Sequence, residues 1–118
     1  MKKYPDEYWM QLAIDEARSA LQENEVPIGA LLVKNNRLIV SAHNRTNKTN
    51  STLAHAEKLV IEEVVANGEK FLNDYTLYVT VEPCLMCAGT IIWSRVGRVV
   101  FGCFDKKAGA AGSIYNAL

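Results

Sequence analysis

Residues 76–84 read Thr76-Leu77-Tyr78-Val79-Thr80-Val81-Glu82-Pro83-Cys84, and this stretch decides the fold. Its first six residues are mostly β-branched or aromatic, which is typical of a strand. Pro83 breaks that strand, and residues 84–94 are predicted to form a helix that begins directly after the proline. Residues 98–103 are again apolar and predict another strand. A strand, a helix and a strand in this order predict a parallel crossover unit.

The residues before this unit predict two helices that flank a hairpin. The apolar residues between Pro5 and about Asn24 recur at helical spacing, which predicts packing against a core. Residues 28–33 and 37–42 predict two strands joined by a turn at Asn35-Asn36. A polar loop follows, and residues 54–65 predict a second helix that ends at Asn67-Gly68. A loop rich in glycine and alanine and a short terminal helix are expected after the last strand.

The predicted fold is therefore α/β, with a mixed sheet covered by helices on both faces. The 118 residues predict one domain over residues 1–118. A composition of 49% hydrophobic and 22% charged residues excludes a disordered tail and a disulfide-stapled miniprotein. No apolar run approaches a membrane span, and no signal-peptide core follows Met1, so we expect a cytoplasmic protein without membrane association.

The charges balance overall but alternate along the chain. The net charge is zero, whereas residues 26–56 carry +4 and residues 83–118 carry +3. Residues 1–25 carry −3 and residues 57–82 carry −4. Scattered solvated charge is the simple interpretation. If both cationic segments meet at one pocket, phosphate binding explains them better.

Three possible metal ligands stand out. The chain has three cysteines, an odd number that favours metal binding or catalysis over a disulfide framework. Cys84 and Cys87 lie three residues apart in the first turn of a predicted helix, so both sulfurs lie on one face. His55 opens the other helix. One nitrogen and two sulfurs suit Zn²⁺ with an open fourth position, because a structural site would have a fourth protein ligand.

Glu57 distinguishes an enzyme from a structural metal site. Zinc with an open position acidifies a bound water molecule. A carboxylate two residues after His55 can take a proton from that water and pass it to a ring nitrogen and then to a departing amine. Taken singly, a histidine at a helix start is usually a capping or surface residue, and a lone pair of cysteines could be redox-active. Together, with Pro83 before the first cysteine, the residues indicate a zinc hydrolase.

Four further residue groups are given structural interpretations. Cys103 is expected to be a buried core thiol, and His43 to be structural or exposed. Glu82 either orders the start of the cysteine helix or is a surface carboxylate. Trp93 and Tyr78 are expected in the core or at an interface.

The motifs His55-Ala56-Glu57 and Pro83-Cys84-Leu85-Met86-Cys87 form the zinc nucleobase deaminase signature. The flanking segments Val26-Pro27-Ile28-Gly29-Ala30, His43-Asn44-Arg45 and Gly109-Ala110-Ala111-Gly112-Ser113 extend the match. With them the chain resembles the bacterial tRNA-specific adenosine deaminases over nearly its whole length. The resemblance implies a cytidine deaminase-like three-layer α/β/α fold, with a mixed five-stranded sheet or a shortened version of it. It also implies conversion of adenosine to inosine at the wobble position of a tRNA anticodon.

The resemblance implies roles for individual residues. His55, Cys84 and Cys87 would bind one Zn²⁺, and Glu57 would carry the proton. A substrate-binding set would comprise Asn44 at the base or ribose, Ile28 in the pocket wall, the amides of Ala56 and Cys84 at the base and hydroxide, and Asp105 and Lys107 at flanking nucleotides. The partners implied are a tRNA anticodon stem-loop and a second copy of the chain in a homodimer.

This chain departs from the family pattern in three places. Thr52-Leu53 stands where the family often has Pro-Thr before its Ala-His-Ala-Glu motif, and Phe104 stands where a basic or small residue is common. The chain ends at Leu118, before a further helix that family members usually have, so we expect a truncated form or a compact relative. Two alternatives therefore stay open: a deaminase of a free cytosine, guanine or adenine base or nucleoside, and a catalytically silent deaminase-fold subunit.

Overall fold

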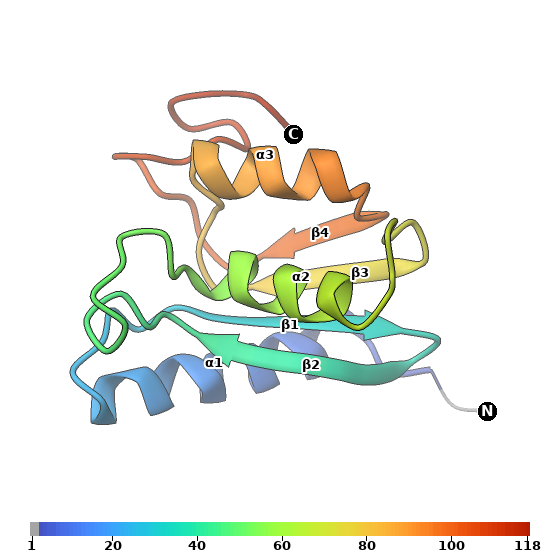
Figure 1. The fold of residues 1–118 in the computed structure, drawn as a ribbon, viewed down its shortest axis with the longest axis horizontal. Helices are drawn as coiled ribbons and strands as arrows, with labels where there is room; N and C mark the ends of the chain where they lie inside the picture. The colour runs from blue at the N-terminus through green and yellow to red at the C-terminus, as the bar shows by residue number, and fades with distance from the viewer. Residues whose placement is uncertain (1–2) are drawn as a thin grey trace.

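The computed structural model describes residues 3–118 and contains one mixed sheet between layers of helices (Figure 1). The strands lie in the order β2-β1-β3-β4, with β3 and β4 parallel and the other pairs antiparallel. This is the predicted α/β class, in the shortened version of the sheet. In chain order the elements are α1 (Asp6–Gln22), β1 (Gly29–Lys34), β2 (Arg37–His43), α2 (Ala56–Ala66), β3 (Tyr75–Val79), α3 (Leu85–Ser94) and β4 (Arg98–Phe101).

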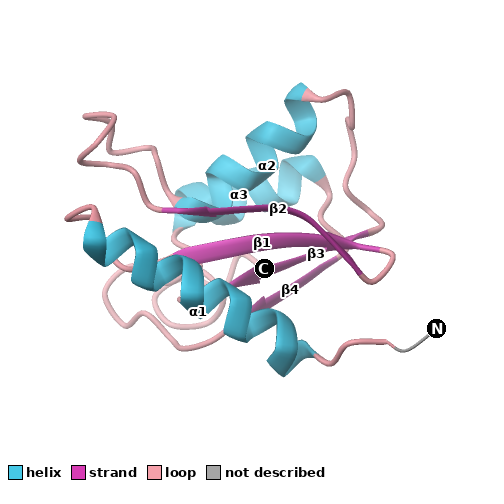
Figure 2. Ribbon diagram, turned by 90° about the horizontal axis from the view of Figure 1, so that it is seen from below, coloured by secondary structure: helices cyan, strands magenta, loops and turns pink. Residues whose placement is uncertain are grey.

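Alternate residues of the central strand β1 supply two separate cores. Ala30 and Leu32 face a core that also contains Val60 of α2 and Ile91 of α3. Leu31 and Val33, which alternate with them, face the opposite core, beneath α1. Successive strand side chains point to opposite faces, so a strand buried on both faces is apolar throughout. Figure 2 shows the result, with α1 on one face and α2 and α3 on the other.

Helix α1 approaches β1 closely at Gly29. A Cβ atom at this position would collide with the backbone carbonyl oxygen of Ala13 in α1. Trp9, which is 5% exposed, and Tyr78 of β3 fill the space further along the same face. The glycine therefore allows the helix to lie against the beginning of β1, where the chain enters the sheet.

The strand register brings two loops to one edge of the sheet. Gly29 pairs with His43 at the end of β2, and Ala30 pairs with Val79 at the end of β3. The loops that leave β2 and β3 therefore start side by side. These loops lead into α2 and α3, so the first turns of both helices lie near the same edge, which we call the loop edge (Figure 1).

The end of the chain differs from the sequence prediction. The predicted short helix after residue 113 is not formed, and residues 102–118 contain bends, turns and isolated bridges. β4 ends at Phe101, two residues earlier than predicted. Cys103 consequently lies outside the sheet and is exposed, so its assignment as a buried core thiol was wrong. Its sulfur lies 3.6 Å from the Thr80 carbonyl oxygen.

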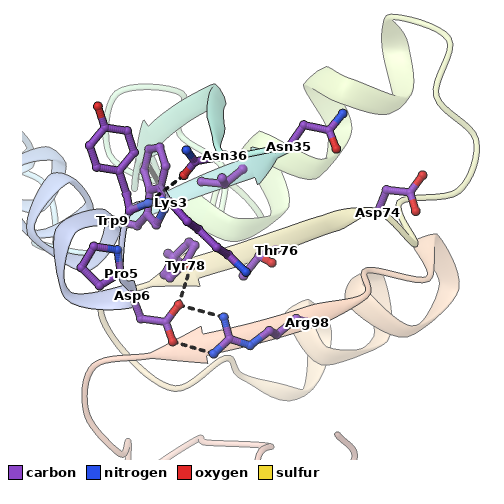
Figure 3. A pocket seen from close by; sticks show the side chains of 12 residues that line it. Lys3, Pro5, Asp6, Trp9, Asn35, Asn36, Asp74, Thr76, Tyr78 and Arg98 are labelled. Atoms are coloured by element: carbon purple, nitrogen blue, oxygen red, sulfur yellow. Dashed lines mark hydrogen bonds and ion pairs between the residues drawn. The ribbon is translucent and has the colours of Figure 1, made fainter. Parts of the chain in front are cut away.

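The opposite edge of the sheet has a cavity of about 590 Å³ that contains none of the predicted site residues (Figure 3). Arg98 at the start of β4 donates two hydrogen bonds, of 2.8 and 2.5 Å, to the carboxylate of Asp6 at the start of α1. The Tyr78 hydroxyl donates a third, of 2.6 Å. These bonds, above all that from Arg98, lower the pKa of Asp6 to about 2. The cluster fastens α1 to the far end of the sheet.

Within residues 3–118, no helix combines the length and the apolar character needed to cross a membrane.

Candidate metal centre and active site

His55 and Cys84 occupy the residue before the first turn of α2 and of α3. Their backbones are extended, with φ and ψ of −81° and 147° at His55 and −76° and 175° at Cys84. Neither side chain caps its own helix. Both side chains are therefore available to a shared ligand at the loop edge, and Cys87 joins them from the first turn of α3.

The three predicted donors converge. The His55 Nδ1 atom lies 3.6 Å from the Cys84 sulfur and 3.5 Å from the Cys87 sulfur. The donor atoms of all three residues lie within 4.8 Å of one another. Tetrahedral zinc, with bonds of about 2.3 Å to sulfur and 2.0 Å to nitrogen, separates such donors by roughly 3.5 Å. The residues present thus fit zinc in both chemistry and spacing.

The three candidate donors shift one another's pKa values. Hydrogen bonds with Cys87 and then His55 lower the pKa of the Cys84 thiol to about 4. The interaction with Cys84, followed by burial, raises the pKa of Cys87. The contact with Cys84 raises the pKa of His55, whose ring also bonds the Thr52 backbone. The lowered pKa favours a thiolate at Cys84, and a bound divalent cation would take the place of the protons that the other donors hold.

Glu57 lies beside the donors in the first turn of α2. It is 4% exposed, although an isolated carboxylate is rarely buried to this extent. Burial raises the pKa of the Glu57 carboxyl. The charge of Cys84 raises this pKa as well, whereas a backbone hydrogen bond and the charge of His55 act in the opposite direction. A buried carboxyl with a raised pKa next to a metal site is typical of a proton carrier.

Asn44 connects the β2 loop to the start of α2. It is 4% exposed, and its Oδ1 atom accepts the backbone amide of Ala56 at 2.8 Å. The Ala56 amide is therefore already used, which differs from its predicted role at the substrate. The backbone carbonyl oxygen of Ile28 accepts a hydrogen bond from the backbone amide of Asn44 at 3.1 Å, and the Ile28 side chain packs against the core. Both residues lie at the loop edge, since Ile28 precedes β1 and Asn44 follows β2.

Glu82 holds the segment that carries Asp105 and Lys107. It is 3% exposed and accepts the Asp105 amide at 3.0 Å, so it is not a surface carboxylate. Burial alone would raise the pKa of Glu82, but the hydrogen bonds it accepts, first that of Ser113, lower it to about 2. The Asp105 carboxylate in turn accepts the Lys107 amide at 3.0 Å.

Sequence reasoning missed Glu25. Its carboxylate, 4% exposed, accepts the amides of Asn47 at 3.0 Å and Lys48 at 2.7 Å and so orders the loop that leads to His55. Because these partners are more than twenty residues away, no local motif identifies them. His43, expected to be structural or exposed, lies between Glu16 and Glu23, with ring nitrogens 2.8 and 2.9 Å from their carboxylates.

Comparison with known proteins agrees with this site. The model of the cytidine and deoxycytidylate deaminase zinc-binding region matches residues 3–103. The tRNA-specific adenosine deaminase of Bacillus subtilis is 51% identical over 114 residues, which are 96% of this chain and 71% of that protein. The chain belongs to the tRNA-specific adenosine deaminase family. It is thus a zinc-dependent hydrolytic deaminase, and His55, Cys84 and Cys87 are a group that could hold its metal ion.

Other relatives of this deaminase extend the comparison. The Aquifex aeolicus tRNA-specific adenosine deaminase is 41% identical, over 95% of this chain and 75% of that protein. A solved structure from work on A-to-I editing by tRNA:A34 deaminases superposes with a TM-score of 0.85 at 47% identity, covering 90% of this chain and 78% of that one. A guanine deaminase from B. subtilis has a TM-score of 0.84 at 30% identity, covering 93% and 71%. The same fold therefore also occurs in a guanine deaminase.

Proposed function

We propose that this deaminase converts adenosine to inosine at the wobble position of a tRNA anticodon, as one zinc deaminase domain that acts in the cytoplasm. The observation that carries the chemistry is the buried Glu57 carboxylate beside the convergent His55, Cys84 and Cys87. The tRNA assignment is supported by relatives of 41–51% identity that are named for this activity. The guanine deaminase is less similar, at 30% identity.

The residues of the chain divide the work of the reaction. Adenosine and water give inosine and ammonia, so a proton must move to a ring nitrogen and another to the departing amine. When bound by His55, Cys84 and Cys87, zinc supplies Lewis-acid activation of water. The Glu57 carboxylate accepts a proton on one oxygen and donates it to the base. Because the Asn44 carbonyl oxygen is held by the Ala56 amide, its amide nitrogen is the end that donates to substrate.

Part of the cationic charge lies where RNA would bind. Arg45 and Lys48 are exposed in the loop before α2, and Lys106 and Lys107 are exposed in the segment after β4. Both segments adjoin the metal centre, since residue 109 forms a bridge with Cys84 and residue 54 precedes His55. The remaining strand cations, such as Arg98, lie at the opposite edge. The loop-edge cations suit the phosphates on either side of an extruded nucleotide.

The substrate is tested with a tRNA anticodon stem-loop that carries adenosine at the wobble position. We expect inosine and ammonia from this RNA, and far less from free adenosine, guanine or cytosine. Turnover of free bases with none of the stem-loop would overturn the tRNA assignment. A stem-loop with guanosine at that position controls for adenosines elsewhere in the loop.

The proton carrier is tested by Glu57→Gln. We expect turnover to fall by about 10²–10⁴-fold, the usual contribution of a general acid–base group, with zinc content unchanged. Glu63→Gln makes the same chemical change at an exposed position of α2 and controls for an effect on the helix. Full activity in Glu57→Gln would show that another group moves the proton. That outcome would not decide between tRNA and a free base as the substrate.

The homodimer is supported by an apolar face on α2 and α3. Trp93 is 86% exposed and Ile92 is 50% exposed, both on α3. Trp93 lines a groove of about 630 Å³ between the two helices, whereas Ile92 lies on another side of α3, near Leu118. Lys58 and Glu62 at the groove pair with each other at 3.0 Å, so its apolar lining of Ile61, Val65 and Trp93 is what remains for a partner. An apolar patch of this kind can pair with its own copy across a two-fold axis. We propose that a second copy of the chain covers this face.

A further inference from the structure

Glu82 is the structural centre of the segment after β4. Besides the Asp105 amide, its carboxylate accepts the amides of Ala111 at 2.7 Å and Ser113 at 3.1 Å, together with the Ser113 hydroxyl. These donors span nine positions of sequence and include no helix or strand. A single buried side chain therefore supplies the acceptors for backbone amides of this segment, which in a strand would come from a neighbouring strand.

The backbone around Glu82 adds to this attachment. The Glu82 amide donates to the Cys103 carbonyl oxygen at 2.8 Å, and the Ala110 amide donates to the Pro83 carbonyl oxygen at 2.8 Å. Gly109 lies so close that a Cβ atom there would collide with the Glu82 carboxylate. Residues 103–113, which we call the clamped loop, thus follow the path of residues 82–84. The last of these is the metal ligand Cys84.

The clamped loop carries exposed groups that suit nucleotides. The Phe104 side chain is 66% exposed, and its ring stands edge-on to Phe101 with centroids 5.4 Å apart. Lys107 is exposed, and its backbone is fixed by the Asp105 carboxylate. An exposed aromatic ring with a nearby cation is the combination that binds a single-stranded base and its phosphate.

We propose that Glu82 is a positioning residue that fixes the clamped loop against the metal centre, so that Phe104 and Lys107 bind the nucleotides flanking the reacting adenosine. The proposal rests on the proposed tRNA function. It assigns Glu82 no contact with the substrate: the carboxylate acts through the loop, and removing it affects the binding of RNA before it affects the chemical step.

Amide hydrogen exchange tests the attachment directly. In Glu82→Gln one acceptor oxygen becomes a donor that faces other donors, so the amides of residues 105, 111 and 113 should exchange at least about tenfold faster. Glu25→Gln is the matched control, because Glu25 is equally buried and holds amides of a different loop. It should accelerate exchange at residues 47 and 48 only. Unchanged protection of residues 105, 111 and 113 in Glu82→Gln would overturn the proposal.

Kinetics with the anticodon stem-loop test the positioning role. We expect Glu82→Gln to raise KM about tenfold while kcat changes by less than about threefold and zinc content is unchanged. Ser113→Ala removes one donor, keeps the carboxylate, and should shift KM in the same direction by a smaller factor. A fall in kcat together with loss of zinc would overturn the proposal, since Glu82 would then support the metal centre instead.

The two proposals fail in different ways. If the unmodified protein does not act on the stem-loop, the proposed tRNA function fails, and with it the role of Phe104 and Lys107 toward RNA. The exchange measurement does not depend on activity, so it still decides whether Glu82 holds the loop.

Discussion

The side-chain oxygen of Asn44 accepts the backbone amide of Ala56 at 2.8 Å, and this bond ties the end of β2 to the first residue of α2. The first amides of a helix have no partner within the helix, and the Ala56 amide is one of them. The His55 side chain, in the capping position of α2, makes no capping hydrogen bond. Asn44 therefore serves as a cap from outside the helix. It leaves His55, the residue in the usual capping position, available to the metal.

Asn44→Ala should leave the buried Ala56 amide without a partner and destabilise the protein by about 1–3 kcal/mol. Asn44→Asp keeps the acceptor and should recover most of that stability, yet it loses the amide nitrogen that we assign to the substrate. Urea unfolding and stem-loop turnover, measured on both variants, separate the two roles. Equal turnover in Asn44→Asp and the unmodified protein would remove Asn44 from the substrate site.

In the metal-free protein, Cys84 should react with iodoacetamide well before Cys87. The lowered pKa of Cys84, about 4, makes it a thiolate at pH 6, whereas the buried Cys87 has a raised pKa and remains a thiol. Zinc should protect both residues. Peptide mapping by mass spectrometry measures this, with the exposed Cys103 as an internal reference that zinc does not protect. Equal labelling of Cys84 with and without zinc would exclude it as a ligand.

Asp6→Asn should lower the melting temperature at pH 7 by a few degrees, because an exposed ion pair contributes at most about 1 kcal/mol. The pKa of Asp6 is about 2 in the folded protein against an ordinary 3.8, so ionised Asp6 favours the folded state above about pH 4. That contribution is lost as the pH falls from about 4 to about 2. The difference in melting temperature between the two proteins should therefore shrink over this interval, and a constant difference would contradict the assignment.

Trp93→Glu should weaken the proposed homodimer by at least about tenfold in Kd, because a large exposed ring at an interface is replaced by a charge. Sedimentation of the zinc-loaded protein over a range of concentrations measures the change. Tyr8→Glu, at an exposed aromatic residue of α1 on the opposite face of the sheet, is the control (Figure 2). A monomeric unmodified protein at every concentration would refute the dimer itself.

Local pattern predicted most of the elements and a group of residues that the fold brings together as possible metal ligands. Apolar periodicity located α1, β1 and α2 to within about two residues, because burial on one or two faces leaves a regular spacing in the sequence. The candidate zinc ligands were also recognisable from the sequence, since His55 and the pair Cys84 and Cys87 stand at predicted helix starts. The end of the chain was mispredicted because its order comes from Glu82, not from its own periodicity.

From the order of its amino acids alone, this chain determines its α/β class, the residues that can hold zinc, and a carboxylate suited to move a proton. Only the tertiary structure decided that Glu25 and Glu82 are buried hydrogen-bond acceptors, that Cys103 is exposed, and that the Ala56 amide is already used by Asn44. The physical reason is distance along the chain. Metal ligands and apolar stripes are recognised from short-range spacing. The buried carboxylates of Glu25 and Glu82, by contrast, accept backbone amides from residues 22 to 31 positions away, which meet them only after the strands have paired.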